Sequence, residues 1–271
     1  MRLSNDIERI TRINVEIAYA DLSSEHRETL IQRSIASTLA NALEMPLIWQ
    51  RDNQWLHSQI LAINGQECLQ EALDEGKGVI IMAPHTGNWE CIGRVLPAYA
   101  PITCLYQPPK YPELETLVKT GRQKAGAIVV PTTQRGIASL LKALRRGEMV
   151  GILPDQVPRA GSGQFAPFFG RPAYTMTLVH SLAQKTGCKI LLGYALRSEK
   201  NNRHGFTAYF SEASEDCYDA DIHSALTAMN TMVEQAVNHS PEQYQWAYKR
   251  YKIQPDNLTN PYRRYRNRSS A

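Results

Sequence analysis

The hydrophobic pattern of the chain changes near residue 76. Before that point, apolar residues recur every four positions at Ile31, Ile35, Leu39 and Leu43. This spacing predicts a helix with one apolar face, typically packed against a core, with membrane contact as the alternative. The apolar stretch at residues 46–49, which opens with a proline, is expected to end that helix. We therefore expect a helical N-terminal extension over residues 1–62.

After residue 76, short continuous apolar runs alternate with helix-like segments. The runs suit strands that are buried on both faces, and they lie at 79–83, 102–106, 127–130, 149–153, 189–194 and 205–210. The main helix-like segments lie at 112–126, 136–147, 175–187 and 221–238. This alternation predicts an α/β fold, with a largely parallel central sheet flanked by helices on both faces. We see no linker, and expect a single domain with its core at 63–255 and a basic tail at 256–271.

The first strong run leads directly into a polar turn, Pro84-His85-Thr86-Gly87-Asn88-Trp89-Glu90. Ligands of open α/β sheets bind beyond the carboxyl ends of the strands, so His85 is expected at a strand-to-helix turn that faces a cleft. Glu90 falls about one turn inside the following helix, within reach of the imidazole. A carboxylate there fixes the histidine tautomer and stabilises the imidazolium. His85 and Glu90 are thus candidates for a general base and its orienting partner.

The spacing of this pair carries little weight by itself. With seven histidines and 26 acidic residues in 271, roughly 0.7 such pairs are expected by chance. A structural, hydrogen-bonded histidine is the alternative. The position after a buried strand, and the Gly-Asn pair that suits a tight turn, favour the catalytic interpretation.

Composition excludes several other classes of function. A formal net charge of +4 is too small to indicate nucleic-acid binding. The five scattered cysteines fit a reduced protein and form no C-x-x-C pair. No histidine cluster has metal-binding spacing, and no P-loop, G-x-G-x-x-G or G-x-S-x-G motif occurs in a suitable place. We therefore expect neither metal nor cofactor, and favour direct transfer to a base-activated acceptor over a covalent enzyme intermediate.

If the protein acts on lipid, we expect it to act from the membrane surface or through an anchor that is missing from this chain. No signal peptide is visible, and no stretch approaches the roughly 18 to 20 apolar residues that cross a bilayer. The chain ends in a basic aromatic segment at residues 262–268. This segment is either a solvated terminus or a contact with anionic lipid head groups.

A second polar stretch also follows a predicted strand. Residues 153–159 and 165–173 mix charged, amide and aromatic side chains, including Asp155 and Gln156. An ordinary long loop is one interpretation, but long loops in compact domains are often functional. We expect this stretch to line the rim of the same cleft as His85, with a capping role for Asp155 as the alternative.

Taken together, these blocks resemble the bacterial lipid A biosynthesis acyltransferases, the late or secondary acyltransferases of the wider lysophospholipid and glycerol-phosphate acyltransferase superfamily. The resemblance extends from about residue 13 to residue 262. The segment from His85 to Glu90 resembles the family's His-x-x-x-x-Asp/Glu block. The other resembling blocks are 106–110, Arg122 with Gly126, Asp155-Gln156, 165–173, 243–246 and 249–252.

The resemblance implies a glycerol-phosphate acyltransferase-like fold and transfer of a fatty-acyl chain from acyl carrier protein to a hydroxyl of a lipid A precursor. It assigns His85 as the base and Glu90 as its partner. Arg122 would meet a phosphate or the donor's anionic arm, unless it is only a surface helix charge. Asp155 and Gln156 would line the site of the membrane lipid acceptor.

The resemblance also implies work at the cytoplasmic face of the bacterial inner membrane. Family members usually carry a hydrophobic N-terminal anchor, and this chain starts where that anchor would end. We expect a peripheral protein, or one whose anchor is absent from this chain. Three alternatives stay open: an acyltransferase for another glycolipid or aminolipid, a thioesterase, and a non-catalytic module that binds lipid or carrier protein. The intact His85 and Glu90 favour an enzyme over the last.

Overall fold

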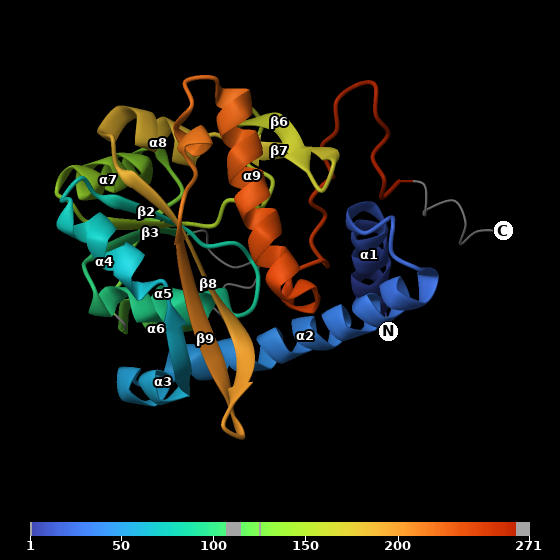
Figure 1. Ribbon diagram of the computed structural model, residues 1–271, viewed down its shortest axis with the longest axis horizontal. Coiled ribbons are helices and arrows are strands. Elements are labelled where there is room, and N and C mark those ends of the chain that lie inside the picture. The colour runs from blue at the N-terminus through green and yellow to red at the C-terminus, as the bar shows by residue number, and fades with distance from the viewer. Residues whose placement is uncertain (1, 107–114, 125, 264–271) are drawn as a thin grey trace. The chain divides into compact units, whose positions relative to one another are not determined.

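The computed structural model describes residues 2–106, 115–124 and 126–263 (Figure 1). The chain divides into two compact units. The sheet unit comprises Asn41–Leu153 and Ser181–Ser214, and the aromatic unit comprises Met1–Ala40, Pro154–His180 and Glu215–Ala271. Helices α2 (Ser24–Gln50) and α8 (Leu178–Thr186) contribute residues to both units. The block at 107–110 and the basic residues at 264–268 lie outside the described residues.

Within the described residues, the sheet unit holds a seven-stranded sheet in the order β1-β9-β8-β2-β5-β3-β4. Its strands are β1 (Ile60–Asn64), β2 (Val79–Met82), β3 (Ile102–Tyr106), β4 (Ile128–Pro131), β5 (Met149–Ile152), β8 (Lys189–Lys200) and β9 (Arg203–Glu212). β8 and β9 form an antiparallel hairpin, and the other neighbouring pairs are parallel. The prediction of a largely parallel sheet is confirmed.

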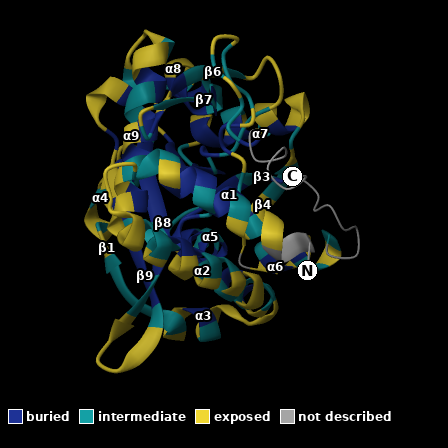
Figure 2. Ribbon diagram, turned by 90° about the vertical axis from the view of Figure 1, so that its right-hand side faces the viewer, coloured by how far each residue is buried: buried dark blue, intermediate teal, exposed yellow. Residues whose placement is uncertain are grey.

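Helices cover both faces of this sheet. They are α3 (Asn53–Gln59), α4 (Gln66–Asp74), α5 (Trp89–Val95), α6 (Glu115–Lys124) and α7 (Gln134–Arg145). The short 3-10 helix η1 (Leu96–Ala98) directly follows α5. In both ribbon views, α7 lies on one side of the central strands and α5 and α6 lie on the other (Figures 1 and 2). All residues of β2 and β5 are buried. The apolar runs of β2 and β5 therefore mark strands covered on both faces, as their sequence predicts. The run at 127–130 does not, because β4 lies at an edge of the sheet and Ile128 is 48% exposed.

Strand β1 lies at an edge of the sheet, and the sequence pattern did not predict it. It begins at Ile60, inside the range expected to be helical. Four of its five residues are only half-buried, so its sequence lacks the fully buried apolar run by which the central strands were found.

The aromatic unit is built from α1 (Arg2–Ala18), the first part of α2, β6 (Gly163–Phe168), β7 (Arg171–Met176), α9 (Ile222–His239) and the 3-10 helices η3 (Glu215–Tyr218) and η4 (Pro241–Gln243). Its core contains five large aromatic side chains, from Phe168, Tyr244, Trp246, Tyr251 and Tyr262. Asn14 on α1 joins this core by donating to the carbonyls of Trp246 and Tyr248, at 2.6 and 2.8 Å. The Tyr262 hydroxyl donates to Asn14 at 2.6 Å, so this first residue of the basic aromatic segment is part of the core.

Strands β6 and β7 form an antiparallel hairpin where the sequence suggested a long loop. The two residues of its turn, Phe169 and Gly170, have φ values of 47° and 68°, which is typical of a type I′ turn. A bulky residue at positive φ is strained. The Phe169 N–H donates to Glu234 at 2.7 Å, and its ring packs on Trp246. Because the chain pairs as β7 up to Met176, α8 begins at Leu178 rather than near residue 175.

Helix α2 differs from its prediction at two places. It continues through Pro46 to Gln50, because buried Arg94 binds the carbonyls that a helix end leaves free, those of Ile48 and Arg51. The predicted apolar face is also only partly a core face. Ile31 is 1% exposed, whereas Leu39 is 56% and Leu43 is 76% exposed. None of the helices in the described part of the chain is long and apolar enough to span a membrane.

Candidate active site

The turn that carries His85 joins β2 to α5, as the sequence predicts. The His85 side chain is buried, with 8% of the residue exposed, and its ring makes an edge contact with Trp89 at 4.9 Å between centroids. The turn is closed by a hydrogen bond of 2.7 Å from the Thr86 N–H to the Pro84 carbonyl. A buried imidazole held at the carboxyl end of a parallel strand is well placed for proton transfer.

Gly87 allows this turn to dock against the sheet. Its φ is +57°, and it forms an isolated bridge with Ala195 of β8. A Cβ at Gly87 would lie 1.9 Å from the Ala195 carbonyl oxygen. The next residue, Asn88, donates its N–H to the same carbonyl at 2.8 Å and caps α5 by accepting from the Cys91 N–H at 3.2 Å. Only glycine fits the backbone at residue 87.

Glu90, the second residue of α5, is paired with Arg122 on α6. The guanidinium donates two hydrogen bonds to the carboxylate, from Nε to Oε2 at 3.1 Å and from Nη2 to Oε1 at 2.5 Å. Burial alone would lower the pKa of Arg122, but the charge and hydrogen bonds of Glu90 outweigh it and raise the pKa above its ordinary value. The guanidinium also lies over the Tyr106 ring at 5.8 Å. Arg122 is therefore paired with a buried carboxylate and is not a solvated helix charge, although 26% of its own side chain is exposed.

A cluster of three side chains, which the sequence pattern did not predict, fixes the position of the His85 turn. Asn41 on α2 donates to the Gly87 carbonyl at 2.9 Å. The Asn88 amide donates to Glu44, also on α2, at 2.9 Å. Arg197 on β8 donates to both α2 side chains, to Asn41 at 2.8 Å and to Glu44 at 2.9 Å. We call Asn41, Glu44 and Arg197 the turn clamp.

A sequence signal for the turn clamp exists in retrospect. Glu44 is the single charged residue between positions 34 and 50. An acid in so apolar a helical segment indicates a specific partner, because an unpaired buried charge is costly. The partner lies about 150 residues later in the chain, so spacing alone does not reveal it.

Asp155 and Gln156 follow β5 in the chain and belong to the aromatic unit. Asp155 is 3% exposed and accepts a hydrogen bond from the Tyr244 hydroxyl. Burial, and then the Asp155 charge, hold the pKa of Tyr244 well above its usual range. Gln156 donates to Gln245 at 3.2 Å. No described helix begins at Asp155, so it is not a helix cap. The structure thus brings the 155–156 block together with the 243–246 block.

The block at 249–252 supports the β6–β7 hairpin. Arg250 is 2% exposed and donates to the Tyr174 carbonyl and the Thr175 hydroxyl, each at 2.7 Å. The Tyr251 hydroxyl donates to the Phe168 carbonyl at 2.9 Å. These residues satisfy buried polar groups of the hairpin, which is a structural role.

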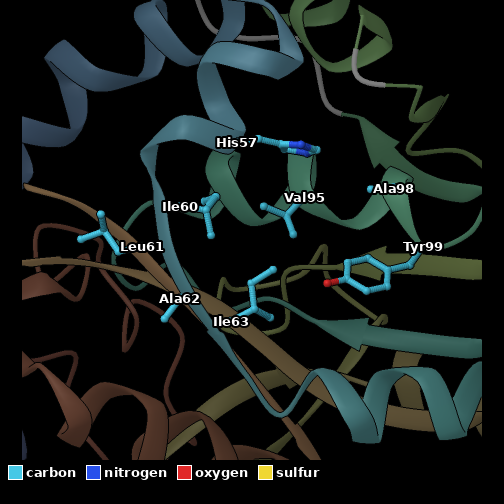
Figure 3. Close-up of a pocket in the computed structure, with 8 residues that line it drawn as sticks. All are labelled: His57, Ile60, Leu61, Ala62, Ile63, Val95, Ala98 and Tyr99. Atoms are coloured by element: carbon cyan, nitrogen blue, oxygen red, sulfur yellow. The ribbon is translucent and has the colours of Figure 1, made fainter. Parts of the chain in front are cut away.

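The sheet unit also contains an apolar pocket of about 300 Å³ (Figure 3). It is lined by His57, Ile60, Leu61, Ala62, Ile63, Val95, Ala98 and Tyr99. None of the predicted site residues lines it. In the described part of the chain, no group of three or more His, Cys, Asp or Glu side chains is arranged to hold a metal ion. All five cysteines are free thiols.

Comparison with known families decides the class of the protein. The family model for bacterial lipid A biosynthesis acyltransferases matches residues 1–253. The chain belongs to this family. The family resemblance seen in the sequence blocks is therefore confirmed, as is the expectation that the protein is an O-acyltransferase.

Similar proteins include three Escherichia coli members of this acyltransferase family. The chain is 28% identical to the lipid A biosynthesis palmitoleoyltransferase over 254 residues, which covers 92% of this chain and 79% of the relative. It is 23% identical to the lauroyltransferase, covering 94% and 82%, and 22% identical to the myristoyltransferase, covering 97% and 80%. The alignments extend over most of both partners, so this acyltransferase acts in acyl transfer of lipid A biosynthesis.

Proposed function

We propose that this protein transfers a fatty-acyl chain from acyl carrier protein to a hydroxyl of a lipid A precursor, with His85 as the general base. The observation that carries the proposal is the buried His85 at the end of β2, on a turn whose backbone is fixed by Gly87 and the turn clamp. A base that is held rigidly loses little entropy when it meets its substrate.

The proposed step needs one proton carrier. The His85 imidazole accepts the proton of the acceptor hydroxyl as its oxygen attacks the carbonyl carbon of the acyl thioester. A C–O bond forms and the C–S bond breaks. The departing thiolate takes the proton from the imidazolium, so His85 returns to its neutral form and the reaction balances.

Glu90 and Arg122 are proposed as supports of this base. In the proposal the Glu90 carboxylate orients the imidazole and stabilises its charged form. The two-bond contact with Arg122 fixes that carboxylate and supports this role. The Arg122 Nη1 group is not engaged in the two bonds to Glu90, and we assign it to a phosphate or to the donor's anionic arm.

Asp155 and Gln156 are proposed to line the acceptor site. Their ties to Tyr244 and Gln245 support this role, because both partners belong to a block that resembles the family's C-terminal signature. The family model extends across both units, which supports our interpretation of the chain as one acyltransferase domain.

The donor and the location are proposed on the same basis. The relatives' names specify palmitoleoyl, lauroyl and myristoyl groups, which supports a fatty-acyl donor. We infer action at the cytoplasmic face of the bacterial inner membrane.

One experiment tests the proposal against its alternatives. Purified protein and the His85→Ala variant are incubated with acyl carrier protein and coenzyme A thioesters of several chain lengths and a panel of lipid acceptors, and the products are read by mass spectrometry. We expect one acyl group to be added to a lipid A precursor, and only by the unmodified protein. Release of free fatty acid alone would identify a thioesterase. Acylation of another glycolipid or aminolipid would correct the acceptor, and no reaction with any donor would indicate a binding module.

A further inference from the structure

The last turns of α2 expose apolar side chains to solvent. Leu43 is 76% exposed and Leu47 is 48% exposed, and they lie four residues apart on one side of the helix. Ala42 beside them is also exposed. Leu39, one turn earlier on the same helix, is 56% exposed. These leucines recur every four residues, so they form a continuous apolar strip along one side of the helix.

The opposite side of these turns is fixed to the sheet unit. Ile48 is 1% exposed, and its carbonyl is bound by Arg94. Trp49 packs so closely on α6 that a Cβ at Gly121 would lie 2.5 Å from the Trp49 Cβ. The one charged residue of the segment, Glu44, is turned to Arg197. The helix therefore cannot rotate to bury Leu43 and Leu47 without breaking these contacts.

Two exposed cations lie where this face ends. Arg51 directly follows α2, and its guanidinium lies over the half-buried Trp55 ring at 5.8 Å. Lys124 on α6 donates to the Gln50 carbonyl at 3.0 Å. At a membrane surface, exposed leucines contact the acyl chains, cations contact the anionic head groups, and tryptophan lies between the two. The leucine row, the two cations and Trp55 provide these three kinds of contact.

We propose that Leu43, Leu47, Arg51 and Lys124 form a docking face for a membrane surface that contains anionic lipids. This inference rests on the proposed function, in which the acceptor is a membrane lipid. The size of the face favours lipid over protein. About three helical turns, roughly 15 Å long and 10 Å wide, offer on the order of 150 Å², whereas a stable protein interface buries about 800 Å² per partner.

The docking face and the proposed active site share one helix. Asn41 and Glu44 hold the His85 turn from the inner side of α2, while Leu43 and Leu47 point outward. The same helical turns that would contact the lipid surface therefore also bind the His85 turn.

Vesicle flotation tests this docking face. The unmodified protein is mixed with vesicles of phosphatidylcholine alone, or with one third phosphatidylglycerol, and compared with the double variant Leu43→Ser/Leu47→Ser. We expect the double variant to bind mixed vesicles at least about tenfold more weakly, because the apolar contact is lost. The double variant Ile128→Ser/Ile137→Ser is the matched control, since these residues are 48% and 39% exposed elsewhere on the sheet unit. It should bind like the unmodified protein.

Arg51→Gln should bind more weakly only to the mixed vesicles, and added salt should have the same effect.

Several outcomes would overturn the docking face. The first is that the unmodified protein fails to bind mixed vesicles. The second is that the Leu43 and Leu47 variant floats like the unmodified protein while keeping its melting temperature. The third is a dimer, seen by sedimentation, that the variant converts to monomer, since the face would then bind a second copy. These vesicles contain neither donor nor acceptor, so failure of the proposed acyl transfer would be seen separately, in the mass-spectrometric assay.

Discussion

At the scale of single residues, the site depends on close approach and charge pairing. Gly87 brings the His85 turn against β8, and Arg122 neutralises a carboxylate that is only 5% exposed. Neither feature follows from the His-x-x-x-x-Glu spacing, which the composition makes nearly a chance event. A second glycine with positive φ, Gly76, and a second two-bond ion pair, Arg146 with Glu148, lack the close packing or the burial, and they serve as controls.

Gly87→Ala is expected to destabilise the protein and abolish activity. Gly87 and Gly76 both have positive φ, but a Cβ at Gly76 would have no atom within 4 Å. Gly76→Ala therefore carries only the backbone strain of about 1 to 2 kcal/mol. Gly87→Ala adds about 1 to 3 kcal/mol for the clash with β8. Urea unfolding of the two variants measures the difference, and equal stability would contradict the close packing of this turn.

Arg122→Gln is expected to be severe, since it leaves Glu90 buried without its cation. Removing one partner of a buried ion pair costs about 3 to 5 kcal/mol. Arg146 makes a similar two-bond contact with Glu148, at 2.7 Å for each bond, but its side chain is 55% exposed. Arg146→Gln should therefore leave stability and activity almost unchanged. If the two variants unfolded at the same urea concentration, the result would contradict the claim that Arg122 neutralises a buried carboxylate.

At the scale of elements, the second half of α2 fixes the His85 turn. Its side chain Asn41 binds the turn backbone and its side chain Glu44 binds Asn88, while Arg197 on β8 donates to both Asn41 and Glu44. These residues act through the turn, so they are positioning residues. Their loss should disturb the orientation of His85 more than the binding of substrate.

Arg197→Gln is expected to lower kcat by roughly 10- to 100-fold with little change in KM, because misplacement of the base by about 1 Å has an effect of this size. Arg197→Lys should restore part of the loss, since it keeps a cation near Glu44. Arg203→Gln on β9 is the control, as this exposed side chain donates to the Ser58 carbonyl. A rise in KM at constant kcat would indicate that Arg197 binds substrate instead.

The sequence predicted the elements that are buried on both sides and missed those defined by distant contacts. Strands β2 and β3 were placed almost to the residue, because a short continuous apolar run between turn residues is typical of a strand covered on both faces. The end of α2 was misplaced because Pro46 argues for a break, and the capping by Arg94 is invisible in the local pattern. The β6–β7 hairpin was missed because its turn uses Phe169 instead of the usual Asn.

At the scale of the whole molecule, the candidate residues are divided between two units. His85, Glu90 and Arg122 belong to the sheet unit, whereas Asp155 and Gln156 belong to the aromatic unit. The order of blocks along the chain identified the family even though each block alone is unspecific. The hydrogen-bond partners of these residues, such as Arg122 for Glu90, required the fold because they lie far away in sequence.

The charge of the whole protein gives a further expectation about the donor. The chain carries a formal charge of +4, and we propose an acidic carrier protein as its partner. Binding driven by opposite charges weakens as salt screens them. Raising ionic strength from about 0.05 to 0.5 M should raise the KM for acyl carrier protein severalfold, with kcat unchanged. A KM that does not respond to salt would contradict electrostatic recognition of the donor.

The central claim is that His85 carries the proton in acyl transfer, and the purified His85→Ala variant tests it most directly. We predict that its rate of transfer to a lipid A precursor, followed by mass spectrometry, falls by about 10²- to 10⁴-fold, while its melting temperature stays close to that of the unmodified protein. Glu90→Ala should lose less, about 10- to 1000-fold. Near-normal transfer by a folded His85→Ala variant would contradict the account.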